Sequence, residues 1–425
     1  MVFVLSHDGQ PLDTCHEARA RKLLNAGRAA IYRRFPFTII LTDRIAAESQ
    51  THPYRLKLDP GSKTSGLAII QEHMARIVWA GELTHRGQWI RNRLLIRRAL
   101  RHNRRQRKTR YRKARFLNRR QPSRWLVPSV AHRVLTTMTW VNRLCRVCPI
   151  TAISVELARF DTQLMQNAEI SGVRYQQGEL AGYEVREYLL EKWQRRCAYC
   201  GIANVPLQVE HMVPRIRGGS DRVSNLTLAC EPCNQQKGAR TASEFGFAQL
   251  MTQAKAPLKD AAVMNMIRWT LYRRLIATGL SVEAGTGGRT KFNRSRLGLP
   301  KAHYLDAACV GGSTPDNLKA HVGSVLLITA MGHGSRQLCR TDKYGFPIRY
   351  VPRQKRHFGF RTGDQVRAVV RRGKNAGTHV GRVIIRTRPS FRLNGIDIHP
   401  KYITLLQRTD GYTYAMRREY TASAD

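Results

Sequence analysis

The chain has 425 residues and carries 73 Lys or Arg against 29 Asp or Glu, so its formal net charge is +44. Repulsion at this charge opposes compaction, and a polyanion relieves it, so we expect a nucleic acid as partner and exclude an ordinary metabolic enzyme. Hydrophobic residues make up 42% of the chain, which allows real cores and excludes full-length disorder, and the length predicts about three domains.

The sequence contains no candidate membrane span or signal peptide. Its longest apolar runs, such as Val325–Ala330, fall far short of the roughly 20 residues that cross a bilayer. The first residues lack the basic flank and cleavage site of a signal peptide. Nine cysteines are an odd count, and four of them form two spaced pairs, which favours metal binding in a reducing compartment over a disulfide framework. We therefore expect a cytoplasmic protein without a membrane partner.

The first 81 residues predict short strands around one helix. In residues 2–50, short apolar runs flank a basic helical stretch, Glu17–Ala26, which ends at Gly27. Residues 54–81 alternate as strands with a Gly/Ser turn between them, which is typical of a meander, and Asp59 lies at the end of the first strand.

A long basic segment follows the meander. Residues 83–155 contain no Asp or Glu, and within them residues 91–124 hold 16 Lys or Arg with few Gly or Pro. A solvated basic tail is the alternative, but tails rarely contain interleaved Trp, Tyr, Phe and Leu. We predict a long basic helix against a nucleic-acid backbone, because like charges this dense repel unless they are neutralised. The predicted phosphate contacts are Arg97, Arg101, Arg104 and Arg105.

The second half of the chain combines helical and strand-like segments. A compact strand at 151–157 contains Glu156, and a cysteine-rich insert occupies 197–240. From residue 345, short strands with turn signals predict a small barrel-like β-domain. Residues 285–298 read as a Gly/Arg-rich loop, and the predicted helices cover 183–196, 241–280 and about 301–310.

Two Cys-x-x-Cys pairs in the insert predict a zinc site. The pairs are Cys197-Ala-Tyr-Cys200 and Cys230-Glu-Pro-Cys233, with 29 residues between them. Two such knuckles close one tetrahedral Cys₄ site, and four thiolates leave no open position on the metal. The zinc is therefore expected to be structural, because it holds together a segment too small to build its own core.

Between and after the knuckles lies a pattern that resembles the HNH nucleases. It comprises the acid–His pair Glu210-His211 on a strand, a central Asn225, and Asn234 at the start of a helix. Glu210 and Asn234 can ligate one Mg²⁺, which stabilises the scissile phosphate and the leaving oxygen. His211 can act as general base on a water, since imidazole as a group titrates near working pH, and Asn225 can fix the loop or the imidazole.

Three further acids, Asp59, Glu156 and Asp306, each lie in a short apolar context far apart in the sequence. A buried carboxylate is costly unless it is paired or binds metal, so a salt bridge is the alternative for any one of them. Their settings resemble the three split motifs of the RuvC nucleases, which have a ribonuclease-H-like fold and bind two Mg²⁺ ions. His303 lies three residues before Asp306, on the same helix face, where it would orient or deprotonate the attacking water.

Three features together resemble the IscB family, from residue 1 to about 312. They are a split RuvC domain, an arginine-rich helix after its first motif, and an HNH insert between its second and third motifs. The resemblance implies a multidomain α/β fold with a RuvC core split in three and a ββα-metal HNH domain. The family's N-terminal module is named for a Pro-Leu-Met-Pro motif, where this chain has Pro11-Leu12 followed by Asp13-Thr14. The implied domains are a PLMP-like domain (1–53), RuvC-I (54–82), the arginine-rich bridge helix (83–125), RuvC-II (126–185), HNH (186–248), RuvC-III (249–330) and a small C-terminal β-rich domain (331–425) that contacts guide RNA and reads the target-flanking motif.

IscB proteins are transposon-encoded, RNA-guided nucleases, so the resemblance implies a concrete function. The partners would be a structured omega RNA and double-stranded DNA with a short flanking motif, with sequence read by base pairing. HNH would cut the guide-paired strand and RuvC the displaced strand, each with Mg²⁺. The protein would be a monomer in a ribonucleoprotein in the prokaryotic cytoplasm, associated with the nucleoid when bound to DNA.

Two other interpretations remain. A protein-guided HNH endonuclease without RNA is disfavoured, because residues 83–155 are more basic than one duplex site requires. A non-catalytic RNA-binding protein explains the charge but gives neither acid set a role.

Overall fold

The computed structural model of the chain divides into two compact units. The first comprises Met1–Leu56, Lys63–Thr151 and Lys319–Asp425, and the second comprises Lys57–Ser62 and Ala152–Leu318. The boundary between the two units passes through two strands, at residues 56/57 and 151/152. The described residues are 1–106, 125–157, 186, 189–190, 192–220, 223–255, 261–332, 339–344, 346–350, 354–386 and 390–418.

The first unit begins with a four-stranded sheet and one helix. The sheet has the order β2-β1-β4-β3, in which β1 and β4 are parallel and the other pairs are antiparallel. Apolar side chains such as Ile39 and Val4 form its core. The predicted helix ends at Asn25, one residue earlier than expected. The elements are β1 (Val2–Leu5), β2 (Pro11–Cys15), α1 (Glu17–Asn25), β3 (Ala29–Arg33) and β4 (Thr38–Leu41).

A larger sheet in the same unit contains the predicted meander. Its order is β5-β6-β7-β12-β22, with β5 contributing Tyr54–Leu56 to this unit. The β7–β12 pair is parallel, whereas β6–β7 and β12–β22 are antiparallel. The last strand of the predicted C-terminal domain therefore pairs with β12 and lies outside the small β-domain. The strands are β5 (Tyr54–Asp59), β6 (Thr64–Gln71), β7 (Arg76–Thr84), β12 (Ser324–Ala330) and β22 (Tyr412–Arg418).

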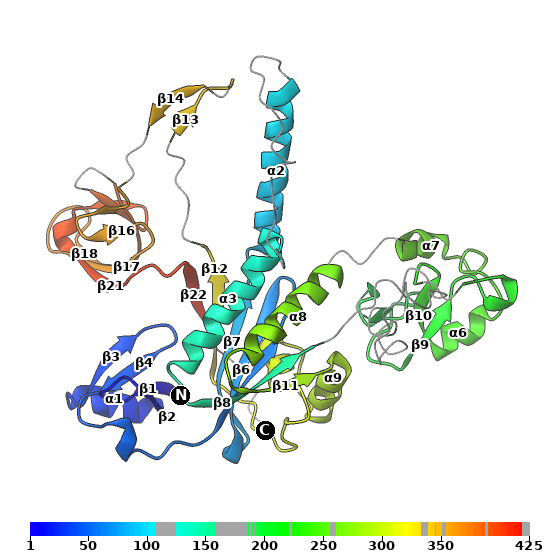
Figure 1. Cartoon of the computed structure of the whole chain (residues 1–425), viewed down its shortest axis with the longest axis horizontal. Helices are drawn as coiled ribbons and strands as arrows, with labels where there is room; N and C mark the ends of the chain where they lie inside the picture. Colours follow the sequence, from blue (N-terminus) through cyan, green and yellow to red (C-terminus); the bar gives the residue numbers. More distant parts are fainter. Residues whose placement is uncertain are drawn as a thin grey trace. The chain divides into compact units, whose positions relative to one another are not determined.

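Two helices follow β7. The basic segment forms α2 (Gly87–Gln106), whose described side chains are mostly exposed, and the rest of the predicted basic helix, residues 107–124, lies outside the described residues. The start of α2 packs against α3 (Pro128–Cys145), which buries one face including Trp140. Figure 1 shows α2 as a long, straight helix. In the described part of the chain, no helix is long and apolar enough to cross a membrane.

The predicted C-terminal β-domain is a five-stranded antiparallel sheet with the order β20-β19-β18-β17-β21. Its core contains Phe391 and Val366. Two short hairpins precede it in the chain. The strands are β13 (Cys339–Thr341), β14 (Pro347–Tyr350), β15 (Arg356–His357), β16 (Phe360–Arg361), β17 (Gln365–Val370), β18 (Gly377–Ile384), β19 (Phe391–Leu393), β20 (Ile396–Ile398) and β21 (Ile403–Gln407).

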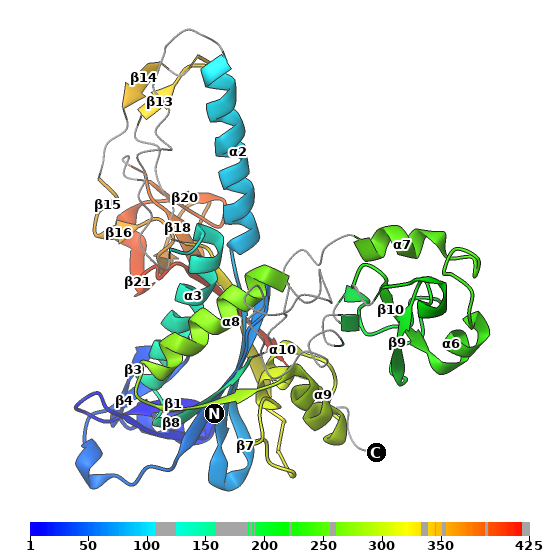
Figure 2. The same cartoon turned by 45° about the vertical axis from the view of Figure 1, so that its right-hand side comes forward.

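The second unit contains a sheet in the order β11-β8-β5, with the end of β5, Lys57–Asp59, belonging to this unit. Strands β8 and β11 are parallel. Helix α8 packs against β11, and Figure 2 shows α10 beside α9. These elements are β8 (Ile150–Glu156), α8 (Ala261–Ile276), β11 (Ser281–Gly285), α9 (Gly287–Arg296) and α10 (His303–Ala308).

The expectation of a loop at 285–298 was wrong, since α9 occupies it. Thr286 caps this helix, because its hydroxyl accepts a hydrogen bond from the Arg289 backbone N–H at 3.3 Å. Thr290 and Asn293 are buried, and Asn293 Nδ2 donates to the backbone carbonyls of Cys309 and Gly311, both at 2.9 Å. Packing against the neighbouring segment thus stabilises a helix that glycine-rich composition disfavours.

The cysteine-rich insert forms a small separate core in this unit (Figure 1, green). Strands β9 and β10 are antiparallel, and helix α6 follows β10 directly. Of the predicted helix at 183–196, residues 183–185, 187–188 and 191 lie outside the described residues, and residues 193–196 are not helical. The elements are β9 (Leu207–His211), β10 (Leu226–Cys230), α6 (Glu231–Lys237) and α7 (Ala248–Lys255).

Candidate active sites

The four cysteines of the two knuckles converge. Their sulfur atoms all lie within 4.8 Å of one another, and among the described residues they are the one group of three or more His, Cys, Asp or Glu that does so. Tetrahedral zinc with Zn–S bonds of about 2.3 Å separates its sulfurs by about 3.8 Å. The Sγ atoms of Cys200 and Cys230 are 3.7 Å apart, and all four thiols are free. The geometry therefore fits a zinc ion.

The backbone around Cys197 favours the thiolate of this residue. Burial raises the pKa of the Cys197 thiol, but backbone N–H groups of Cys200 and Cys230 outweigh it, and the net pKa falls to about 7. The Ala198 backbone N–H donates to Leu228 on β10 at 2.8 Å, which joins this knuckle to the strand that leads into the second. Cys197 is thus held in a form that can ligate zinc, because the thiolate is the metal ligand.

The predicted acid–His pair lies at the end of β9. Antiparallel pairing with β10 places Glu210 opposite Thr227 and His211 opposite Leu226. Glu210 is 6% exposed, and both of its carboxylate oxygens have a partner. Lys237 Nζ on α6 lies 2.6 Å from Oε1, and the Tyr199 hydroxyl donates to Oε2 at 2.6 Å.

The remaining residues of this pattern surround the acid–His pair. Asn234 lies on α6, which packs against β9, and its Nδ2 donates to Gln208 Oε1 at 2.6 Å. The Asn225 amide donates to the carbonyls of Val213 and Ser220 and accepts from the Val213 backbone N–H, each at 2.9 Å. Asn225 therefore fixes the loop after His211. A carboxylate and an amide oxygen are hard donors, which suit Mg²⁺.

The second candidate site is formed by the acids predicted from three distant segments. Asp59 ends β5 and Glu156 ends β8, the neighbouring strand, while Asp306 lies on α10. His303 begins α10 and is exposed. The carboxylates of Asp59, Glu156 and Asp306 do not lie within 4.8 Å of one another as a set. Carboxylate oxygens are ligands that Mg²⁺ prefers, and two Mg²⁺ ions about 3.5–4 Å apart can be held by carboxylates that do not all touch one another.

Two of these acids are held by arginines. Arg268 on α8 donates from an NH2 nitrogen to Glu156 Oε1 at 2.8 Å, and Arg294 Nε on α9 lies 2.8 Å from Asp306 Oδ1. Burial raises the pKa of Asp306, and nearby Glu156 raises it further, whereas Arg294 lowers it. The carboxylates of Glu156 and Asp306 thus lie near enough to interact electrostatically.

A buried polar network holds the turn after α10. Lys57, fully buried on β5, donates from Nζ to the Val310 carbonyl at 2.7 Å and to Thr314 Oγ1 at 3.0 Å. Glu283 on β11 accepts from Ser154 Oγ at 2.6 Å and from the Ser313 backbone N–H at 3.0 Å. This network fixes α10, and with it Asp306, against the sheet.

The predicted phosphate contacts lie on α2. Arg97, Arg101 and Arg105 are exposed and spaced four residues apart, so they share one helix face. Within the described residues, no acid pairs with them. Arg104 lies on the same helix, and its side chain is outside the described residues.

Two protein families match this chain. The family described as RRXRR protein matches residues 2–178, which include α2, Asp59 and Glu156, and the family described as HNH endonuclease matches residues 197–240, which include both knuckles and the acid–His pair. The chain is therefore an IscB-like, HNH-containing DNA endonuclease. Among curated proteins, none matches it.

Solved structures similar to this endonuclease include Cas9 proteins. Streptococcus thermophilus Cas9 in complex with the GGAA PAM is 14% identical over 61% of this chain and 32% of that chain, with a TM-score of 0.24. The Type II-C Cas9 enzyme from Actinomyces naeslundii is 18% identical over 44% of this chain and 32% of that chain, with a TM-score of 0.16. The endonuclease thus spans about a third of the length of these proteins.

Sequence reasoning missed the residues that hold the acids. Tyr199 lies inside the first knuckle, and Lys237 follows Asn234 by three residues, on the same face of α6. Arg268 lies 112 residues after Glu156, the acid that it contacts. Arg294 lies in the segment 285–298, which the sequence predicts to be a loop. Helical spacing could have indicated Lys237, whereas the other pairs form only through tertiary contacts.

Proposed function

We propose that this endonuclease is guided by RNA and cleaves both strands of duplex DNA. The observation that carries the proposal is α2, an exposed helix with a row of arginines, in a chain that also contains an HNH endonuclease segment and the acids Asp59, Glu156 and Asp306. Phosphate contacts from such a row bind a nucleic-acid backbone without reading its sequence. Sequence would then be read by base pairing with an omega RNA, and the protein would read a short flanking motif.

In the HNH domain, Glu210 and Asn234 would hold Mg²⁺, which supplies charge stabilisation at the scissile phosphate. His211, beside Glu210 at the end of β9, would accept a proton from water as the water oxygen attacks phosphorus and the bond to the leaving oxygen breaks. Asn225 keeps the loop after His211 in place through its three hydrogen bonds. We assign the guide-paired strand to this site.

In the RuvC-like site, Asp59, Glu156 and Asp306 would hold two Mg²⁺ ions, and His303 would orient or deprotonate the attacking water. Within the second unit, the order β11-β8-β5 supports a ribonuclease-H-like arrangement, since Asp59 and Glu156 lie at the ends of neighbouring strands. We assign the displaced strand to this site. The complex would contain one protein chain and one RNA and would act in the cytoplasm.

The test is to purify the protein with its bound RNA, sequence that RNA, and assay a plasmid that contains the matching target. We expect one discrete RNA species and Mg²⁺-dependent cleavage that EDTA abolishes. Cleavage that persists after the RNA is removed would favour a protein-guided endonuclease. Bound RNA without any cleavage would favour a non-catalytic RNA-binding protein.

A further inference from the structure

We propose that Tyr199 positions Glu210 for metal binding and so connects the zinc knuckle to the chemistry of the HNH site. The inference rests on the proposed role of Glu210 as a Mg²⁺ ligand. Tyr199 lies between Cys197 and Cys200, so a zinc ion bound to these two cysteines would also fix the Tyr199 backbone.

The contact between the two side chains is short and buried. The Tyr199 hydroxyl donates to Glu210 Oε2 at 2.6 Å, and the two residues are 7% and 6% exposed. Oε1 of the same carboxylate is held by Lys237 at 2.6 Å. A carboxylate with one partner can rotate about its last side-chain bond, whereas a carboxylate held at both oxygens has one orientation. Each oxygen keeps a second lone pair, so these contacts leave acceptor capacity for a metal ion.

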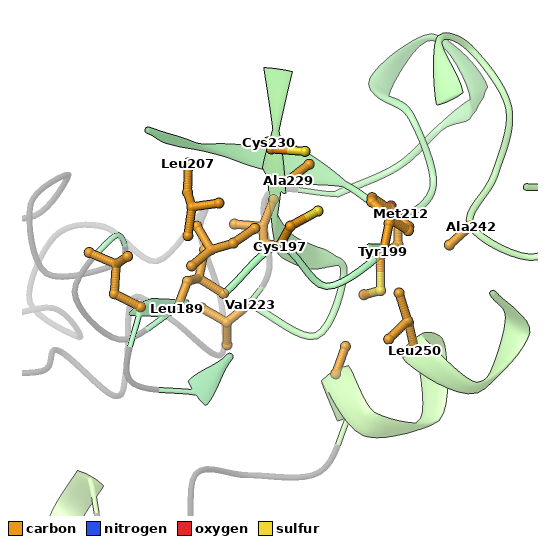
Figure 3. Close-up of a cluster of buried hydrophobic side chains, with 14 residues drawn as sticks. Leu189, Cys197, Tyr199, Leu207, Met212, Val223, Ala229, Cys230, Ala242 and Leu250 are labelled. Carbon is orange, nitrogen blue, oxygen red and sulfur yellow. The ribbon is translucent and has the colours of Figure 1, made fainter. Parts of the chain in front are cut away.

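The tyrosine ring is itself held in place. Phe245 and Phe247 each pack edge-on against it, with ring centroids 5.2 Å away, and they contact each other at 5.4 Å. Figure 3 shows Tyr199 inside the buried cluster of the HNH domain, close to Met212. Met212 follows His211, and its backbone N–H donates to the Asn225 carbonyl at 2.8 Å. The ring thus packs beside the segment that carries the acid–His pair.

Through Tyr199, these contacts connect the cysteines that would bind zinc to the carboxylate of Glu210. The metal would fix Cys197 and Cys200, the knuckle and two phenylalanines fix the ring, and the hydroxyl fixes one carboxylate oxygen. Groups that orient metal ligands typically change metal affinity or activity by about 10–100-fold when they are removed. The zinc would therefore have a second role beyond stabilising the fold, because it sets the orientation of a ligand for another metal.

Tyr199→Phe tests the proposal, because it keeps the ring contacts and removes only the hydroxyl. We expect cleavage of the guide-paired strand to fall about 10–100-fold and its half-saturating Mg²⁺ concentration to rise. Zinc content and cleavage of the displaced strand should stay at wild-type values. Tyr54→Phe is the matched control, since Tyr54 is a buried tyrosine whose hydroxyl accepts from Gln71 and lies in the other unit.

Two further measurements separate positioning from folding. In a Glu210→Gln background, Tyr199→Phe should cause no additional loss, because its effect acts through that carboxylate. In an Asp59→Ala, Asp306→Ala background, Mn²⁺ binding followed by electron paramagnetic resonance should weaken about 10-fold on Tyr199→Phe. Wild-type Mg²⁺ dependence, loss of zinc, or additive losses in the double variant would each overturn the proposal. If Glu210→Gln alone left cleavage intact, the role of Glu210 in the proposed function would be wrong instead.

Discussion

The two candidate sites of this endonuclease are built in opposite ways. The HNH site comes from one continuous segment, residues 197–240, closed by four cysteines. The RuvC-like site draws its acids from strand ends and a helix between residues 59 and 306. A short segment buries little apolar surface, so a zinc ion on the four cysteines, which the geometry fits, would compensate. The distant acids instead depend on a sheet whose strands bring their ends together.

Both sites nevertheless hold their acids in the same way. Glu210, Glu156 and Asp306 are paired with Lys237, Arg268 and Arg294, respectively. A buried carboxylate is costly unless it is paired or binds metal, so a basic side chain of the fold stabilises each of these acids when no Mg²⁺ is bound. The two sites thus differ in what holds their backbone together, but in both of them basic side chains pair with acids.

The largest expected effect separates the two sites completely. Asp59→Ala should leave a nickase of the guide-paired strand, whereas His211→Ala should leave cleavage of the displaced strand only, because each change removes chemistry from one site. Strand-specific end labels on a plasmid target report both cuts. If Asp59→Ala abolished both cuts while target binding survived, two independent sites would be the wrong description.

The next prediction concerns the two frames. Cys200→Ser should release zinc and unfold the HNH segment, which abolishes cleavage of the guide-paired strand, while cleavage of the displaced strand largely persists. Zinc content per chain and strand-specific cleavage are measured together. Cys339→Ser, which changes a thiol outside the zinc group, is the control. Loss of the HNH cut with one zinc still bound would contradict a structural zinc.

A smaller effect is expected from the cation that holds Glu156. Arg268→Leu leaves a buried carboxylate unpaired, which should destabilise the protein by about 3–5 kcal/mol and weaken cleavage of the displaced strand. Urea unfolding and strand-specific rates provide the measurement. Arg274→Leu, at an exposed position on the same helix, should change neither quantity. Equal effects of the two substitutions would show that the pair with Glu156 contributes nothing.

The smallest effect should fall on both sites equally. Replacing Arg97, Arg101, Arg104 and Arg105 by Gln should weaken RNA binding and leave strand choice unaltered. Each lost phosphate contact should flatten the slope of log affinity against log salt by roughly 0.7–0.9. Binding titrations at three salt concentrations test this. The control replaces four arginines that are exposed on other helices by Gln: Arg19, Arg21, Arg273 and Arg274. Unchanged affinity and slope would place the RNA elsewhere.

The sequence determined the local features of this protein. Spacing of cysteines predicted the zinc group, and the acid–His pair at 210–211 was placed on a strand, because these patterns are complete within a few dozen residues. The charge distribution predicted the basic helix, whose described part is α2. Strand alternation predicted the meander and placed Asp59 at the end of its first strand, β5. This was possible because a period-two pattern can be read without knowing the partner strand.

Only the tertiary structure decided which partners the acids have. Arg268 reaches Glu156 across 112 positions in the chain, and Tyr199 reaches Glu210 from inside a metal knuckle. Helix α9 forms in a segment whose glycines predict a loop, because Asn293 is bonded to the turn after α10. Such contacts depend on how distant segments pack, and no spacing within one segment encodes them. The sequence therefore identified the acids, and the fold selected the cations that hold them.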